Sequence, residues 1–448
     1  MTPEGTGRRA RLLALASLLL AAPLGAKPAM PDPMRLRADV ATLVSFGTRQ
    51  SLSSATDPKR GIGAARRWAA GVFADMGKGC GGCLAVETIG DQFKGERAPD
   101  GVRIEDVLAI QKGSDGFDNV IIVAGHIDSR VTDILDATSD APGANDDGSG
   151  SALVLEAARI LSKEKHRATI VYALLSGEEQ ALWGGELLAK TARARGWHVS
   201  AMLNNDIVGN TVGTDGRVVA DRVRVFSEGI RSSEDAAATA ARRLSGGEDD
   251  GPSRALARFV KGVAAHDPAA GGLAVFAIRR PDRFRRGGDH LPSLEQGFPA
   301  VRFTVGVENY NAEHQALRTE NGIAYGDTID KMDFRYLAKV TALNVATIRA
   351  LGAAPPAPAA ASLAGALSSD TAASWSAVPG AAGYHLYSRP GDSSDWKSEA
   401  IVGADATSHV FKGLVVDDNF FGVAALGGDG KAGAPESLIT FAGLPARN

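Results

Sequence analysis

Apolar runs of strand length, separated by segments of helix length, constrain the fold of this chain more than any other feature. The run 168–175 is apolar almost throughout, which is typical of a strand buried on both faces of a parallel sheet. Segments 149–161 and 180–194, on either side of it, show the periodicity of amphipathic helices. Strands that alternate with helices of this length predict an α/β fold, with a largely parallel mixed sheet sandwiched between helices over residues 33–352.

Other segments continue this alternation. Further strands are expected at 84–89, 102–110, 119–124, 202–207 and 300–305, and further helices at 64–76 and 333–351.

A second domain, with a different sequence pattern, follows a stiff linker. Residues 353–361 form this Pro/Ala linker, with three prolines among alanines. Residues 362–446 contain short strand patterns separated by turn residues, which is typical of an all-β sandwich.

The N-terminus has the pattern of a secretory signal peptide. Arg8 and Arg9 precede an apolar run at 12–22, and Ala26 provides a small residue for cleavage. The apolar run is shorter than the roughly 20 residues that a membrane span needs. We therefore expect residues 1–26 to be removed, the protein to be secreted or periplasmic, and no stable membrane insertion.

Composition excludes several classes of function. The chain is 44% hydrophobic with a formal net charge of -3, so it has no basic excess for binding nucleic acid. It has two cysteines, Cys80 and Cys83, too few for a multi-cysteine metal cluster. The two glycines between them favour a local structural disulfide in the oxidising compartment that export implies, with a redox motif as the alternative.

Acidic and imidazole side chains follow the predicted strands, at segments 125–128, 143–150, 176–180, 205–206 and 313–314. In α/β sheets, ligands bind at the carboxyl ends of the strands, so we expect these segments to form one site. Two imidazoles and three carboxylates suit zinc. Because four carboxylates in one crevice would repel one another, Glu178 included, the set predicts two divalent cations.

The order of these motifs is similar to that of the di-zinc aminopeptidase family, which includes secreted bacterial leucyl aminopeptidases, glutamate carboxypeptidase and the glutaminyl cyclases. The resemblance covers about residues 100–350. It rests on Gly-Ala-Asn-Asp-Asp-Gly-Ser-Gly at 143–150 and on Gly-Glu-Glu-Gln at 177–180, followed by Gly184 and Gly185.

The resemblance implies a ligand set for two Zn²⁺ ions. Asp146 would bridge both ions. His126 and Asp206 would complete one site, and Glu179 and His314 the other. His290 and His266 are the alternatives to His314, because Glu313 stands where relatives often have Tyr.

The resemblance also implies two catalytic residues that bind no metal. Glu178 would act as the general base towards a metal-activated water. Asp128 would accept the second ring N–H of His126 and so hold its tautomer.

The resemblance leads us to expect an exported zinc-dependent exopeptidase acting on peptides, with aminopeptidase activity as the first expectation. The alternatives are a carboxypeptidase acting on short or acidic peptides on the same scaffold, and a non-catalytic peptide-binding or adhesive protein. Five arginines at 279–286 are either a solvated loop or a rim that grips a substrate carboxylate.

The C-terminal domain resembles a fibronectin type III module, in which Trp375 and Tyr384 would pack the core. Contact with a cell surface or a polysaccharide is one expectation for this module, and a plain spacer is the alternative. The sequence leaves the oligomeric state open.

Overall fold

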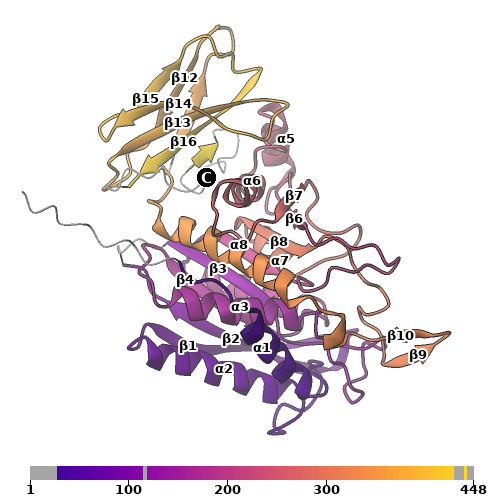
Figure 1. The fold of residues 1–448 in the computed structure, drawn as a ribbon. Coiled ribbons are helices and arrows are strands. Elements are labelled where there is room, and N and C mark those ends of the chain that lie inside the picture. The colour runs from indigo at the N-terminus through magenta and orange to yellow at the C-terminus, as the bar shows by residue number, and fades with distance from the viewer. Residues whose placement is uncertain (1–27, 115–118, 359, 428–437, 441–448) are drawn as a thin grey trace, which may run out of the picture.

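The structure, a computed structural model, describes residues 28–114, 119–358, 360–427 and 438–440 (Figure 1). The predicted signal peptide, residues 1–26, lies outside these residues. In the part of the chain that is described, no helix is both long enough and apolar enough to span a membrane.

Within the described residues, a central sheet of eight strands has the order β1-β2-β4-β3-β5-β8-β6-β7. Its inner strands β4, β3, β5 and β8 are parallel, and β2 and β6 join them in antiparallel pairing. The predicted mixed sheet is therefore confirmed. The strands are β1 Leu84–Gly95, β2 Ala98–Gln111, β3 Asn119–His126, β4 Thr169–Leu175, β5 His198–Asn205, β6 Arg222–Phe226, β7 Ala274–Ile278 and β8 Ala300–Val305.

Helices cover both faces of this sheet (Figure 1). Alternate residues of β3 point to opposite faces, so that Ile121 belongs to one hydrophobic core and Ile122 to the other. Leu153 of α3 and Leu343 of α8 pack in the first core, and Leu188 of α4 packs in the second. The helices are α1 Pro33–Ser45, α2 Ile62–Gly79, α3 Gly148–Leu161, α4 Trp183–Ala194, α5 Ala236–Leu244, α6 Pro252–His266, α7 His290–Glu295 and α8 Phe334–Ala353.

The sequence patterns did not predict the elements between residues 208 and 290. Strands β6 and β7 have five residues each, and β7 at the sheet edge is only partly buried, so its apolar pattern is weak. The stretch between β8 and α8 also contains an exposed hairpin of β9, Arg318–Glu320, and β10, Ile323–Tyr325. A disulfide joins Cys80 to Cys83 between α2 and β1, in agreement with the structural interpretation of this pair.

The described C-terminal strands form two small sheets, of three and four strands. Trp375 and Tyr384 lie in the core between them, with ring centroids 5.4 Å apart. The all-β expectation is confirmed, and the resemblance to fibronectin type III stays a prediction. The strands are β11 Ala361–Ala364, β12 Thr371–Trp375, β13 Gly383–Pro390, β14 Lys397–Gly403, β15 Ser408–Phe411, β16 Asn419–Leu426 and β17 Leu438–Thr440.

A buried arginine joins the two domains. Arg389 of β13 has no solvent exposure, and its guanidinium lies 3.3 Å from Asp249 and 2.9 Å from Asp250. Both aspartates belong to the connection between α5 and α6. The ring of Phe420 lies 4.0 Å from the same guanidinium.

Candidate metal centre

The strand ends bring the predicted ligands together. His126 is the last residue of β3, and Asp206 directly follows β5. Glu179 lies in the loop after β4, and His314 lies in the loop after β8. Because these four strands are parallel neighbours, their carboxyl ends meet at one edge of the sheet.

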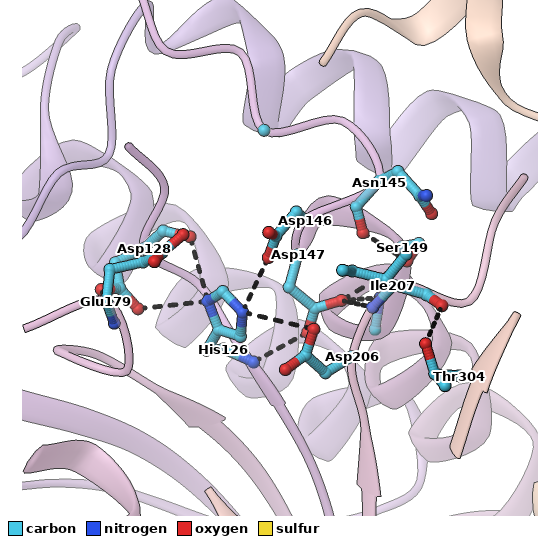
Figure 2. A network of polar contacts seen from close by, with 12 residues as sticks. His126, Asp128, Asn145, Asp146, Asp147, Ser149, Glu179, Asp206, Ile207 and Thr304 are labelled. Carbon is cyan, nitrogen blue, oxygen red and sulfur yellow. Dashed lines mark hydrogen bonds and ion pairs between the residues drawn. The ribbon is translucent and has the colours of Figure 1, made fainter. Parts of the chain in front are cut away.

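The ligand candidates form two groups that share one residue. His126 and Asp206 lie with Asp146 in one group, and Glu179 and His314 lie with Asp146 in the other. Within each group the donor atoms are within 4.8 Å of one another. Asp146 Oδ1 is 3.1 Å from His126 Nε2, whereas Asp146 Oδ2 is 2.9 Å from His314 Nε2. One carboxylate therefore presents a separate oxygen to each group. Figure 2 shows its contact with His126.

Two of the atoms that could bind a metal ion in this cluster are buried without a hydrogen-bond partner. They are Nε2 of His126 and Oε1 of Glu179. Leaving such atoms unsatisfied costs about 1–3 kcal/mol each, unless they have another partner. Imidazole nitrogen and carboxylate oxygen are ligands that bind zinc in proteins. The residues therefore fit a zinc centre.

Asp128 supports both groups. Nδ1 of His126 lies 3.2 Å from the backbone carbonyl oxygen of Asp128 and 3.3 Å from its carboxylate Oδ1. The hydrogen bond from the ring goes to the carbonyl oxygen of Asp128, and not to its carboxylate, which was predicted as the acceptor and whose Oδ1 has no hydrogen-bond partner. Oδ2 of Asp128 accepts hydrogen bonds from Ser51 Oγ, at 3.1 Å, and from the backbone N–H of Glu179, at 3.3 Å.

Two further aspartates hold the segment that carries Asp146. The peptide bond from Asp146 to Asp147 is cis, and Asp147 caps α3 by accepting the N–H of Gly150 at 2.8 Å. Oδ2 of Asp327 accepts the backbone N–H groups of Asn145, at 2.8 Å, and Asp146, at 2.7 Å. Sequence reasoning assigned no role to Asp327, because its partners lie far away in the chain.

Arg302, a buried arginine at this centre, was missed in the sequence. It has no exposure, and it lies 2.9 Å from Asp206 Oδ1 and 3.3 Å from Asp282 Oδ2. The available signal was a charged residue within the mainly apolar run 300–305. Such residues are rarely buried unless they are paired.

A second arginine, Arg130, was also missed. Its Nε lies 2.7 Å from Glu179 Oε2, and its Nη2 lies 2.6 Å from His314 Nδ1. The sequence offered one signal, since Arg130 stands two residues after Asp128 at the end of the His-x-Asp segment.

Glu178 lies among the charged groups of the centre and keeps partial exposure to solvent. Enclosure by the protein raises the pKa of its carboxyl group well above the ordinary value, and the negative charges of Asp206 and Glu179 act in the same direction. The positive charge of His126 opposes this change.

The alternative histidines lie elsewhere. His290 is fully buried, and its Nε2 lies 2.7 Å from the carbonyl oxygen of Pro281. His266 is exposed at the end of α6, where its Nδ1 lies 2.9 Å from the carbonyl oxygen of Gly262. Neither belongs to a ligand group, whereas His314 does.

Two of the five arginines in the run 279–286 have a structural role that neither interpretation anticipated, whereas Arg279, Arg280 and Arg285 are exposed, as expected for a solvated loop. Arg286 lies 2.7 Å from Glu308 and also pairs with Glu313, and Arg283 lies 3.6 Å from each of these carboxylates. Arg283 is almost fully buried, so it is not part of a solvated loop. Because Glu313 precedes His314, these pairs hold the loop that carries this histidine.

A small recess opens beside the centre. It is lined by Asn145, Asp146, Ile207, Asn309, Ala312, Glu313 and Asp327. Three of these side chains are carboxylates, so the recess has an acidic wall next to both ligand groups.

Sequence comparison finds similarity to a peptidase family and to probable zinc metalloproteases. The model of peptidase family M28 matches residues 106–347. A probable zinc metalloprotease of Leptosphaeria maculans is 43% identical over 396 residues, covering 88% of this chain and 91% of that protein. One of Pyrenophora tritici-repentis is 41% identical over 411 residues, covering 90% and 84%.

Solved structures share the fold. The LapA aminopeptidase of Legionella pneumophila matches with a TM-score of 0.50 and 17% identity, over 70% of each chain. A glutaminyl cyclase of Fimbriiglobus ruber also matches with a TM-score of 0.50, with 19% identity, over 72% of this chain and 96% of its own. Because an aminopeptidase and a cyclase match equally well, the fold alone does not select the reaction.

Proposed function

From the premise that this chain belongs to peptidase family M28, we propose that it is an exopeptidase that removes N-terminal residues from peptides at a centre of two zinc ions. The family and the zinc metalloprotease relatives make it a zinc-dependent metallopeptidase, which is a hydrolase. The non-catalytic alternative is therefore not retained. The aminopeptidase activity, the number of ions and the role of each residue form the proposal.

The position of Asp146 is the observation that supports two ions. Its two carboxylate oxygens lie beside different histidines, and each histidine belongs to a group of three donors. We propose that Asp146 bridges the ions. His126 and Asp206 would complete one site, and Glu179 and His314 the other.

Zinc bound here would polarise the substrate carbonyl group and lower the pKa of the attacking water. Glu178 would accept the proton of that water and deliver it to the leaving amine. Glu178 suits this role because it lies among the charged groups of the centre and keeps partial exposure to solvent, so that its carboxylate can meet the attacking water. Asp128 would keep the ring of His126 in the orientation that presents Nε2.

The charges around the recess favour a substrate amine over a substrate carboxylate. Asp327 lines it with a carboxylate oxygen, Oδ1, that has no hydrogen-bond partner, and such a group attracts an α-ammonium group. The sequence offered the five arginines at 279–286 as a grip for a carboxylate. Arg283 and Arg286 are already engaged with Glu308 and Glu313, which weakens the case for a carboxypeptidase.

Export remains part of the proposal. It rests on the signal pattern in residues 1–26. The Cys80–Cys83 disulfide is of the kind that persists in oxidising compartments.

Metal analysis combined with a substrate panel tests the proposal. We expect two zinc ions per chain and hydrolysis of aminoacyl amides. Chelation should abolish this activity and added zinc should restore it. The matched N-acetylated amides should not be cleaved, because they lack the α-ammonium group. A single zinc ion per active chain would contradict the two-ion centre, and cleavage of the acetylated amides would contradict the aminopeptidase assignment.

A further inference from the structure

We propose that Arg130 is a positioning residue that holds Glu179 as a one-oxygen ligand of the metal ion it would share with His314. This inference rests on the proposed function, because it requires that Glu179 and His314 bind a metal ion.

The two carboxylate oxygens of Glu179 have different partners. Oε2 lies 2.7 Å from Nε of Arg130, within hydrogen-bond distance of a charged donor. Oε1 is buried without a hydrogen-bond partner and lies 3.2 Å from Nε2 of His314. The guanidinium therefore occupies one oxygen and leaves the other facing the donor group that includes Asp146.

The backbone of Glu179 is held independently of this contact. Its N–H donates to Asp128 Oδ2 at 3.3 Å, and its carbonyl oxygen accepts from Arg97 Nη1 at 2.8 Å. The side chain of Glu179 is only 3% exposed and that of Arg130 is 15% exposed, so solvent competes little for this pair. With the backbone held at both ends, Arg130 determines which carboxylate oxygen faces the metal.

One-oxygen binding has a chemical consequence. A carboxylate can bind a cation through one oxygen or through both. A second oxygen on the same ion would fill a coordination position that a catalytic zinc site keeps for water or substrate. Keeping Oε2 on Arg130 preserves that position.

The contact of Arg130 with His314 cannot persist when the ring binds metal. A guanidinium group only donates hydrogen bonds, so Nδ1 of His314 has to accept at the 2.6 Å contact. A neutral imidazole that binds metal through Nε2 carries its proton on Nδ1 and cannot accept there. Glu179 is therefore the ligand that Arg130 continues to hold.

Zinc affinity of the full-length protein tests this inference. Arg130→Met removes the donor and keeps much of the side-chain volume. We expect one of the two zinc-binding steps to weaken about 10- to 100-fold, as for other supporting contacts to metal ligands. The other step should be unchanged in competition titrations with a chromophoric chelator. Arg130→Lys keeps the charge without the planar fork and should lie between the Met variant and wild type.

Arg217→Met is the matched control, because this arginine is 67% exposed, pairs with Asp215 and belongs to neither ligand group. It should bind zinc as the wild type does. If wild type binds two ions and Arg130→Met binds both with unchanged or higher affinity, this inference is overturned and the proposed function stands. If wild type binds fewer than two, the proposed function itself fails. Should Arg130→Met not fold, Arg130→Lys decides, and wild-type affinity for both ions in that variant overturns the inference.

Discussion

Two adjacent glutamates, Glu178 and Glu179, lie in different surroundings in this protein. Glu179 is buried and paired with Arg130, with one oxygen left for a ligand group. Glu178 keeps partial exposure and has a raised pKa. Its surroundings suit proton transfer, whereas those of Glu179 suit metal binding, although the two residues are adjacent in the chain.

Glu178→Gln separates these roles. The amide keeps the shape of the side chain and cannot accept a proton, so we expect wild-type zinc content and a loss of about 10²–10⁴-fold in kcat. Metal analysis and steady-state kinetics of the same sample provide the measurement. Glu179→Gln, the matched variant, should lose zinc instead. A Glu178→Gln enzyme with wild-type kcat would exclude this residue as the base.

At the scale of elements, close contact between α3 and the sheet shapes the centre. A Cβ atom added to Gly150 of α3 would lie 2.0 Å from the carbonyl oxygen of Asn205 in β5. One added to Gly125 of β3 would lie 2.6 Å from the carbonyl carbon of Gly150. The two glycines therefore let the start of α3, with Asp146 just before it, approach the strand ends that carry His126 and Asp206.

Gly150→Ala should therefore destabilise the protein, since the added methyl group meets backbone that cannot move freely. Overpacking of this kind costs about 1–3 kcal/mol. Gly262→Ala in α6 is the comparison, because nothing lies within 4 Å of its added Cβ. That helical position should gain about 0.5–1 kcal/mol from the higher helix propensity of alanine. Denaturant unfolding measures both, and equal effects would show that the approach of α3 is not tight.

At the scale of the whole molecule, the C-terminal domain is attached by more than its linker. Arg389 is buried against Asp249 and Asp250, and Arg258 also contacts Asp250 at 2.5 Å. The similarity to the Leptosphaeria protein covers 88% of this chain, which is more than the whole stretch from residue 1 to the end of α8. The similarity therefore extends into the C-terminal domain.

Replacing Arg389 with Met should lower the free energy of unfolding by about 3 kcal/mol, because removing one partner leaves the buried carboxylate of Asp250 short of positive charge. Activity on a small aminoacyl amide at 25 °C should stay near wild type, since the connection between α5 and α6 holds none of the ligand candidates. Lys261→Met is the control. Lys261 forms an exposed pair with Asp395 at 3.7 Å, and such pairs contribute about 1 kcal/mol or less. Equal stability of the two variants would contradict a stabilising role of the buried contact.

The sequence by itself determined the α/β alternation and the residue types at the strand ends, because periodicity and strand length are local properties. It also supplied five ligand candidates, because its motifs follow one another in the same order as in the family it resembles. Only the tertiary structure decided that His314 rather than His290 joins the cluster, and that Arg130 and Arg302 pair with Glu179 and Asp206. These pairs join residues that are far apart in the chain; Arg130 and Glu179, for example, are separated by 49 positions. No local sequence pattern encodes which distant charged residues meet.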